Sequence, residues 1–153
     1  MTTEKELLKQ KIIEFQQTIA ALKLSNVQNQ EQFFKKEKDS FLNLLDIMDA
    51  FATLEKNLET KKDKLDKSAK MLGKNILSIH RKLFRHFRSA SIFQMEFPGN
   101  KATMEYCKII ETREHPELEN ETILEIVKNG YIYKQDNMVL RKAEVITVLN
   151  DDF

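Results

Sequence analysis

Apolar side chains recur at alternating spacings of four and three residues over the first third of the chain. The seam formed by this repeat contains Leu8, Ile12, Phe15, Ile19, Leu22, Asn26, Asn29 and Phe33. Such spacings place the side chains along one line of a helix, which is the line by which parallel helices pair in a coiled coil. The pattern therefore predicts a long helix that pairs lengthwise with a second helix.

Two asparagines, Asn26 and Asn29, lie on the seam itself. Buried amides at seam positions weaken helix pairing but help to fix its register. Alternatively, the coiled coil loosens around these two residues. The sequence favours neither interpretation over the other.

A wider apolar stripe begins after the seam changes phase near Ser40. Its members are Phe41, Leu44, Leu45, Met48, Phe51, Leu54 and Leu58. A stripe of this width exceeds what a two-stranded coil needs and predicts a helix bundle. The polar residues 57–64 are the expected bend. Beyond them, heptad spacing returns in a second predicted helix at Leu65, Ala69, Leu72, Ile76, Ile79 and Leu83.

The length of the first helix predicts a homodimer. Only Gly73 interrupts residues 1–97, so little in the sequence breaks a helix there. A helix of about 55 residues extends for roughly 80 Å, and one chain has too few helices to cover it. We expect a parallel dimeric coiled coil that continues into a dimeric four-helix bundle. The residues expected to bury the dimer and bundle interface are Leu44, Leu45, Met48, Phe51, Leu72, Ile76 and Ile79.

After about residue 90 the pattern of apolar and polar residues changes to short apolar or alternating runs separated by turn-forming residues. Such runs are typical of an antiparallel sheet of short strands. Residues 133–138 predict a hairpin loop, and Gly130 predicts a turn or bulge where φ is positive or a backbone passes close. We expect an α+β fold: residues 1–60 form the long coiled-coil helix, 61–90 the second helix of the bundle, and 91–153 a small C-terminal all-β domain.

Charge is divided between the two parts of the chain. Residues 1–90 contain 18 Lys and Arg against 12 Asp and Glu, a net +6, while residues 91–153 contain 7 against 12, a net −5; together they give the net charge of +1. A nucleic-acid-binding protein usually concentrates strong positive charge on one surface, so we expect no nucleic-acid partner. No apolar run approaches the roughly 20 residues that span a bilayer, so we expect no membrane partner either.

The N-terminal residues lack the apolar core of a signal peptide. A single cysteine, Cys107, excludes an intrachain disulfide and fits a reducing compartment. We therefore expect a cytoplasmic protein.

The sequence contains no constellation of enzyme residues. His80 and Cys107 have no partner at metal-ligand spacing, and three glycines in total leave no glycine-rich phosphate loop. We expect no catalytic residue, no cofactor and no metal. Cys107 alternates with apolar neighbours in a predicted strand, which favours a buried thiol over a nucleophile. The acidic residues 111–121 are interpreted as a solvated loop.

A basic stretch ends the second predicted helix. Arg81, Lys82, Arg85 and Arg88 lie three or four residues apart. Cations near the end of a helix favour its dipole, which is the structural interpretation that we prefer. The alternative is a patch that binds phosphate or lipid.

The closing segment "KNGYIYKQDNMVLRKAEVITV" (residues 128–148) resembles that of the GrpE family, the nucleotide exchange factors of DnaK-type chaperones. The positions that fit are Gly130, Tyr131, Val139, Leu140, Arg141, Ala143, Val145 and Val148. "ETILEIVKNGY" is similar to the family's preceding strand, and "FLNLLDIMDAFATLEKNLE" to its Leu-Leu-x-x-x-Asp helix, with matches at Leu44, Leu45 and Asp49. The resemblance covers most of residues 40–148 and is most specific at the C-terminal segment.

Four positions depart from the family pattern. Met104 replaces a usual histidine, Arg88 follows Phe87 where a glycine is usual, Met138 replaces a basic residue, and Lys142 replaces a frequent proline. Positions of hinge and contact type have changed while core positions persist. The departures suit a divergent member tuned to one chaperone, or one that has lost exchange activity.

The resemblance implies a co-chaperone of protein folding and the stress response that binds the nucleotide-binding domain of a DnaK-type chaperone and promotes ADP release. The contact residues that it suggests in the β domain are Val127, Lys128, Met138, Arg141 and Lys142. For two of them another role is open: Val127 as a core residue and Arg141 as a structural salt bridge inside the β domain. The alternative function is a structural coiled-coil adaptor, or a degenerate GrpE-like protein, that binds a partner without exchange activity.

Overall fold

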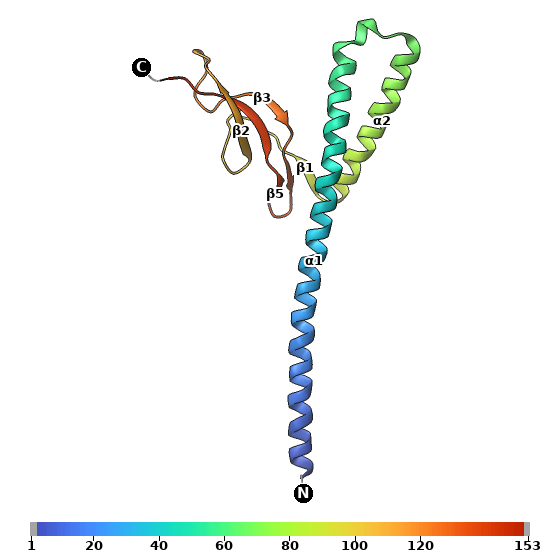
Figure 1. The fold of residues 1–153 in the computed structure, drawn as a ribbon, viewed down its shortest axis with the longest axis vertical. Coiled ribbons are helices and arrows are strands. Elements are labelled where there is room, and N and C mark those ends of the chain that lie inside the picture. The colour runs from blue at the N-terminus through green and yellow to red at the C-terminus, as the bar shows by residue number, and fades with distance from the viewer. Residues whose placement is uncertain (1–2, 152–153) are drawn as a thin grey trace. The chain divides into compact units, whose positions relative to one another are not determined.

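The computed structural model describes residues 3–151 and contains two long helices followed by a β domain. The elements are α1 (Glu4–Thr60), a short 3-10 helix (Lys62–Lys64), α2 (Lys67–Ser89), β1 (Ile92–Gln94), β2 (Cys107–Arg113), β3 (Ile123–Lys128), β4 (Tyr131–Tyr133), β5 (Met138–Arg141) and β6 (Ala143–Val148). This order confirms the α+β class with a long N-terminal helix, a second helix and a small C-terminal β domain (Figure 1). The chain divides into two compact units, residues 1–40 and 41–153.

The first unit consists of the N-terminal part of α1. The helix begins with a reciprocal cap, because the Glu6 backbone N–H donates to Thr3 Oγ1 at 3.3 Å and the Thr3 N–H donates to Glu6 Oε2 at 3.0 Å. The apolar seam is exposed in a single chain at Leu8, Ile12, Phe15, Ile19, Leu22 and Phe33. Both predicted seam amides, Asn26 and Asn29, are exposed as well.

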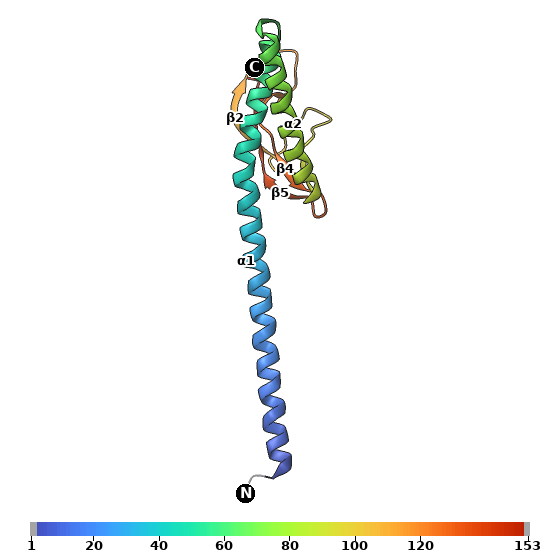
Figure 2. The same ribbon diagram turned by 90° about the vertical axis from the view of Figure 1, so that its right-hand side faces the viewer.

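In the second unit the C-terminal part of α1 and α2 lie side by side as a helical hairpin (Figures 1 and 2). Residues 61–66 form the turn, and Asp66 caps α2 by accepting a hydrogen bond from the Ala69 N–H at 2.7 Å. Gly73 lets the helices approach closely, because a Cβ there would meet a methyl carbon of Leu58 at 3.1 Å. The turn overlaps the predicted bend at residues 61–64 but extends to Asp66, so Leu65, expected in the second helix, lies in the turn.

One apolar core joins the helical hairpin to the first sheet. We call it the helix–sheet core; its buried members are Phe41, Leu45, Met48, Phe87, Ile92, Tyr131, Tyr133 and Leu140. Aromatic rings meet across it: the ring centroids of Phe41 and Phe87 are 5.4 Å apart, and those of Phe87 and Tyr131 are 5.9 Å apart. Burial of these large side chains fixes the β domain against the helices within the second unit.

The strands form two three-stranded sheets, in the orders β1-β4-β5 and β2-β6-β3. The first sheet is antiparallel, as expected. In the second, β3 pairs antiparallel with β6 but β2 pairs parallel with β6, which corrects the expectation of a purely antiparallel domain. The connection from β2 to β6 includes three other strands, so it is long enough for the chain to return in the same direction.

The predicted hairpin is present: β4 and β5 pair antiparallel, with Tyr133 opposite Met138. Gly130, just before it, does not have positive φ. It is required instead by close approach, since a Cβ at this position would lie 2.5 Å from Met95 Sδ and 2.6 Å from the backbone nitrogen of Ala143. Of the two explanations open from the sequence, the passing backbone is correct.

A second, smaller core lies against the sheet β2-β6-β3. Its buried members are Ala102, Cys107, Ala143 and Val145. Cys107 is a buried free thiol at the start of β2, as the alternating sequence predicted.

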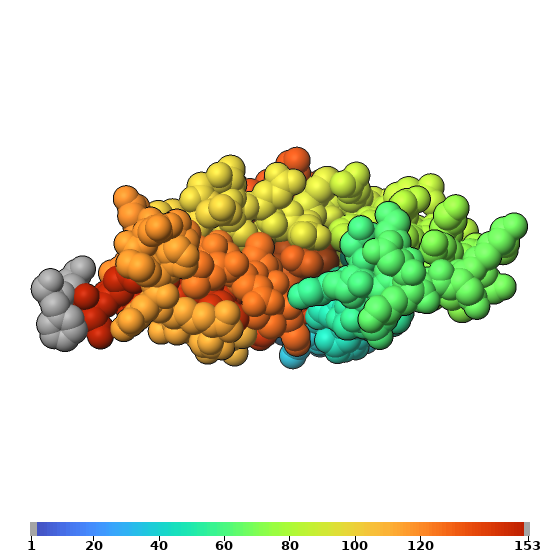
Figure 3. Space-filling model, turned by 90° about the horizontal axis from the view of Figure 1, so that it is seen from above, coloured from blue at the N-terminus to red at the C-terminus, as the bar shows by residue number. Residues whose placement is uncertain are grey.

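In Figure 3 the end of α2 and the segment after it (yellow-green to yellow) form one flank of the second unit, beside the orange strands and loops.

Candidate partner-binding site

The edge strands of the sheet β2-β6-β3 carry exposed apolar side chains. Ile126 and Val127 on β3 are 40% and 46% exposed, and Ile109 and Ile110 on β2 are 39% and 45% exposed. The central strand β6 is almost entirely buried. Because successive strand residues point to opposite faces, Ile126 and Val127 leave both faces of β3 open to a partner. We call Ile126 and Val127, which are adjacent on one edge strand, the edge-strand patch.

Two of the predicted contact residues, Val127 and Lys128, lie next to each other on β3 with exposed side chains. The exposure of Val127 excludes its alternative role as a core residue. Lys128 is opposite Glu144 in the sheet register.

Lys142 is exposed, and its Nζ donates a hydrogen bond to the Met104 carbonyl at 2.7 Å. The Met104 side chain is 77% exposed. These two positions both depart from the family pattern, and the fold brings them together although they are 38 residues apart in the sequence. Met138, another departure, is half-buried and packs against the helix–sheet core.

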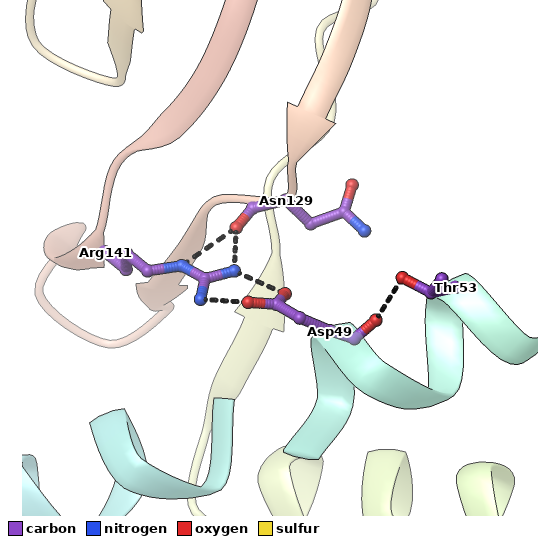
Figure 4. A network of polar contacts seen from close by, with 4 residues as sticks. All are labelled: Asp49, Thr53, Asn129 and Arg141. Carbon is purple, nitrogen blue, oxygen red and sulfur yellow. Dashed lines mark hydrogen bonds and ion pairs between the residues drawn. The ribbon is translucent and has the colours of Figure 1, made fainter. Parts of the chain in front are cut away.

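Arg141 joins the β domain to α1 (Figure 4). Its Nη1 and Nη2 donate to the two carboxylate oxygens of Asp49 at 2.7 and 2.8 Å, and its Nη2 and Nε donate to the Asn129 carbonyl at 2.7 and 3.2 Å. The side chains are only 18% and 23% exposed. The salt bridge that the sequence suggested is therefore present, but it runs from β5 to α1 rather than inside the β domain.

The electrostatics of this contact follow from its geometry. Hydrogen bonds to Asp49 raise the pKa of Arg141 above its ordinary value, so the guanidinium remains charged. Tyr131 lies beside it, with the guanidinium carbon 5.6 Å from the ring centroid. Burial raises the pKa of Tyr131 to about 12, and the nearby Arg141 opposes that rise.

Sequence reasoning recognised Asp49 and Arg141 as matches to a family but did not pair them. They are 92 residues apart, and no local pattern links positions so distant. It also missed the burial of His80, whose Nδ1 is 3.2 Å from Glu55 Oε2 and whose ring stacks on Phe51. The heptad spacing gave the only available signal for that contact, by placing Phe51 on the face of α1 that packs.

The residues expected at a dimer interface fall into two groups. Leu45 and Met48 are 0% and 1% exposed, so their burial is complete within a single chain. Leu44, Phe51 and Ile76 are half-buried. Leu72 and Ile79 are 61% and 52% exposed and lie seven residues apart on α2; on α1 the exposed Ile47 and Leu54 repeat that spacing.

Within residues 3–151, none of the helices combines the length and apolar character needed to cross a bilayer. The same residues contain no group of three or more histidine, cysteine or acidic side chains placed to hold a metal ion.

The order of elements, with a long helix, a helical hairpin and a β domain exposing its edge strands, is the fold class that the resemblance implied. A GrpE family model matches residues 1–148 of the 153, and the chain belongs to the GrpE family. At the level of the family, this supports a role of the DnaK nucleotide exchange factor type, and members of the family are co-chaperones rather than enzymes. A comparison with curated proteins gave no match.

Proposed function

We propose that this chain binds the nucleotide-binding domain of a DnaK-type chaperone in the cytoplasm and promotes the release of ADP. The family match over residues 1–148 is the observation that carries the proposal. The protein needs no bond chemistry for this role. A ligand that binds the open form of a nucleotide cleft more tightly than the closed form shifts the population toward the open form, from which ADP leaves.

The edge-strand patch and its basic neighbours are the proposed contact surface. Val127 and Lys128 on β3 present an apolar and a cationic side chain in adjacent positions, and Lys142 adds a second cation. Arg141 contributes by holding the β domain to α1 through Asp49. A β domain held in one orientation loses less conformational entropy on binding. More of the free energy of its contacts with the chaperone therefore remains to stabilise the complex.

We propose that the active form is a homodimer. The seam of the first unit and the exposed pairs Ile47 and Leu54 on α1 and Leu72 and Ile79 on α2 are uncovered in one chain. Exposed apolar side chains at regular helical spacing mark a protein interface. A second copy presents the same heptad spacing and is the natural cover.

The test is the release of a fluorescent ADP analogue from a DnaK-type chaperone, measured in a stopped-flow experiment with and without this protein. We expect faster release with the protein present. The double variant V127E/K128E should lose most of this effect while keeping its helical circular dichroism spectrum. The control K70E, which reverses a lysine charge as K128E does but at an exposed position of α2, should leave the release rate unchanged.

The adaptor function is the second candidate because Met104 and Lys142, both departures from the family pattern, meet on the surface of the β domain. An adaptor or a degenerate GrpE-like protein binds a partner protein without exchange activity, so binding to the chaperone in sedimentation with an unchanged rate of ADP release would support it. That outcome would show that the function is partner binding rather than nucleotide exchange. Absence of binding to any DnaK-type chaperone tested would remove the exchange function and leave an adaptor with a partner other than a chaperone.

A further inference from the structure

A basic groove runs between α2 and β1. Its volume is about 740 Å³, within the range of roughly 300–1,000 Å³ that is usual for ligand sites. Three arginines from successive turns of α2, namely Arg81, Arg85 and Arg88, line one side. The other side consists of the three residues of β1 and Glu96, and Phe84 and Tyr131 contribute aromatic surface.

The three arginines have exposed side chains, and none takes part in an ion pair within residues 3–151. Lys82, which neighbours them in the sequence, does not line the groove. The dipole at the end of α2 accounts for a cation near its last turn, but Arg81 lies two turns earlier, beyond the reach of that effect. Three unpaired guanidinium groups on one wall favour a ligand with several negative charges.

The opposite wall is an edge strand. In the sheet order β1-β4-β5, β1 pairs with β4 on one side only. Apart from its ladder with β4, no other backbone hydrogen bond is made by Ile92, Phe93 or Gln94 within the described residues. An edge strand offers its free N–H and C=O groups to an added extended chain, which is a recurrent mode of peptide recognition.

The dimensions of the two walls agree. Arg81 to Arg88 spans about 10 Å along the helix axis, at 1.5 Å per residue, which is the length of about three residues of an extended peptide, so two carboxylates on alternate residues lie along the three arginines. Carboxylates on alternate residues of a strand are about 6.6 Å apart, close to the roughly 6 Å rise between Arg81 and Arg85. Glu96, which also lines the groove, disfavours an acidic side chain beside it and limits where such a peptide can lie.

The groove stays accessible in the homodimer proposed above. At about 100° per residue, the three arginines lie roughly 140–180° around α2 from Leu72, on the opposite side of the helix from the exposed apolar pair. A second copy covering Leu72 and Ile79 would therefore leave Arg81, Arg85 and Arg88 open. The groove is also separate from the edge-strand patch, because its lining comes from α2, the segment 92–96 and Tyr131.

We propose that this groove is a docking site for an extended acidic peptide, which adds to the free edge of β1 and places its carboxylates on Arg81, Arg85 and Arg88. A nucleic acid fits less well, because its sugar–phosphate backbone lacks the regularly spaced N–H and C=O groups that pair with the free edge of β1. The proposal is independent of ADP exchange. It gives the protein a second contact, for a partner with an acidic segment.

The experiment is fluorescence anisotropy with the full chain and a labelled peptide of alternating Glu and Thr, about seven residues long. The counterpart peptide has Gln in place of Glu. We expect the acidic peptide to bind and the neutral one to bind at least about tenfold more weakly. N-methylation of alternate peptide backbone nitrogens should weaken binding by a similar factor, since it removes the donors of strand addition.

The variant R81Q/R85Q/R88Q should reduce affinity at least about tenfold, because it removes all three charge-assisted contacts. The matched control K70Q/K74Q/K82Q removes as many charges from the same helix outside the groove and should change affinity by less than about twofold. Circular dichroism of both variants checks that the fold is retained. Equal loss in both variants, or tighter binding of a single-stranded oligonucleotide or anionic vesicles than of the acidic peptide, would overturn the proposal.

Discussion

Asp49 on α1 and Arg141 on β5 form a bidentate salt bridge, with N–O distances of 2.7 and 2.8 Å, across the boundary between the helical hairpin and the β domain. The same guanidinium donates to the Asn129 carbonyl, just before β4. One side chain therefore fixes three separate segments of the second unit. Because the pair is mostly shielded from water, its loss should lower the free energy of unfolding more than the loss of a surface ion pair.

The first prediction concerns this pair. Asp49→Asn or Arg141→Gln should each lower the free energy of unfolding by about 1–3 kcal/mol, because each leaves a partly buried charge without its partner. The double variant should lose less than the sum of the two, with a coupling energy of about 1–2 kcal/mol. Urea unfolding followed by circular dichroism measures all four values.

The matched control is Arg113→Gln. The ion pair of Arg113 with Glu111 has both side chains about half exposed, at 53% and 51%. We expect this variant to leave the free energy of unfolding essentially unchanged, because solvent screens an exposed ion pair. Strictly additive losses at Asp49 and Arg141 would show that the two side chains do not stabilise the fold together.

The second prediction concerns the close approach at Gly130. In Gly130→Ala the new methyl group would lie 2.5 Å from Met95 Sδ and 2.6 Å from the Ala143 nitrogen. The methionine side chain can move, but the backbone of Ala143 is held in a central strand. We expect a loss of about 1–3 kcal/mol in the free energy of unfolding, measured in urea.

Gly99 is the comparison for that variant, because a Cβ added there meets nothing within 4 Å. Gly99→Ala should be neutral or stabilise the fold by up to about 1 kcal/mol, since alanine reduces the entropy of the unfolded chain. If both alanine variants unfold at the same urea concentration, contact at Gly130 is not what the glycine avoids.

The third prediction is a pH dependence that arises from Tyr131. Burial raises its pKa from 10.0 to about 12, so between these values the folded protein holds a proton that the unfolded chain has lost. The stability due to this group is therefore complete below pH 10 and declines as the pH rises toward about 12. Urea unfolding of the protein and of Tyr131→Phe at several alkaline pH values measures the difference, because the variant lacks this titration. Parallel pH curves for the two proteins would exclude the effect.

The sequence predicted those features that depend on neighbours along the chain. Heptad spacing predicted both helices, and the polar residues between Tyr133 and Met138 predicted the hairpin. The parallel pairing of β2 with β6 was not foreseen, because alternation within a strand does not say which strand lies beside it. For the same reason Asp49 and Arg141 matched a family pattern separately, while their contact became visible only in the fold.

Periodicity also left the two apolar faces of the helical hairpin unresolved. Leu45 and Leu72 have the same heptad signal, yet Leu45 is fully buried in its own chain and Leu72 is 61% exposed. A repeat identifies side chains that share a line on a helix, but not whether the covering surface belongs to the same chain or to another. The substitution Leu45→Asp would bury a charge in the core of the protomer and unfold it, so it could not test dimerisation.

The last prediction therefore uses the exposed positions. Leu72→Asp and Ile79→Asp should convert the proposed homodimer into a folded monomer, because a charge at an apolar dimer interface is buried without a partner while the protomer core is untouched. Lys74→Asp, at an exposed position on another face of α2, is the matched control and should leave the dimer intact. Sedimentation velocity and light scattering measure the mass, and circular dichroism checks the helix content. A dimer that persists in both variants would move the interface away from Leu72 and Ile79, whereas a monomeric parent protein at micromolar concentration would show that the exposed apolar stripe has another partner.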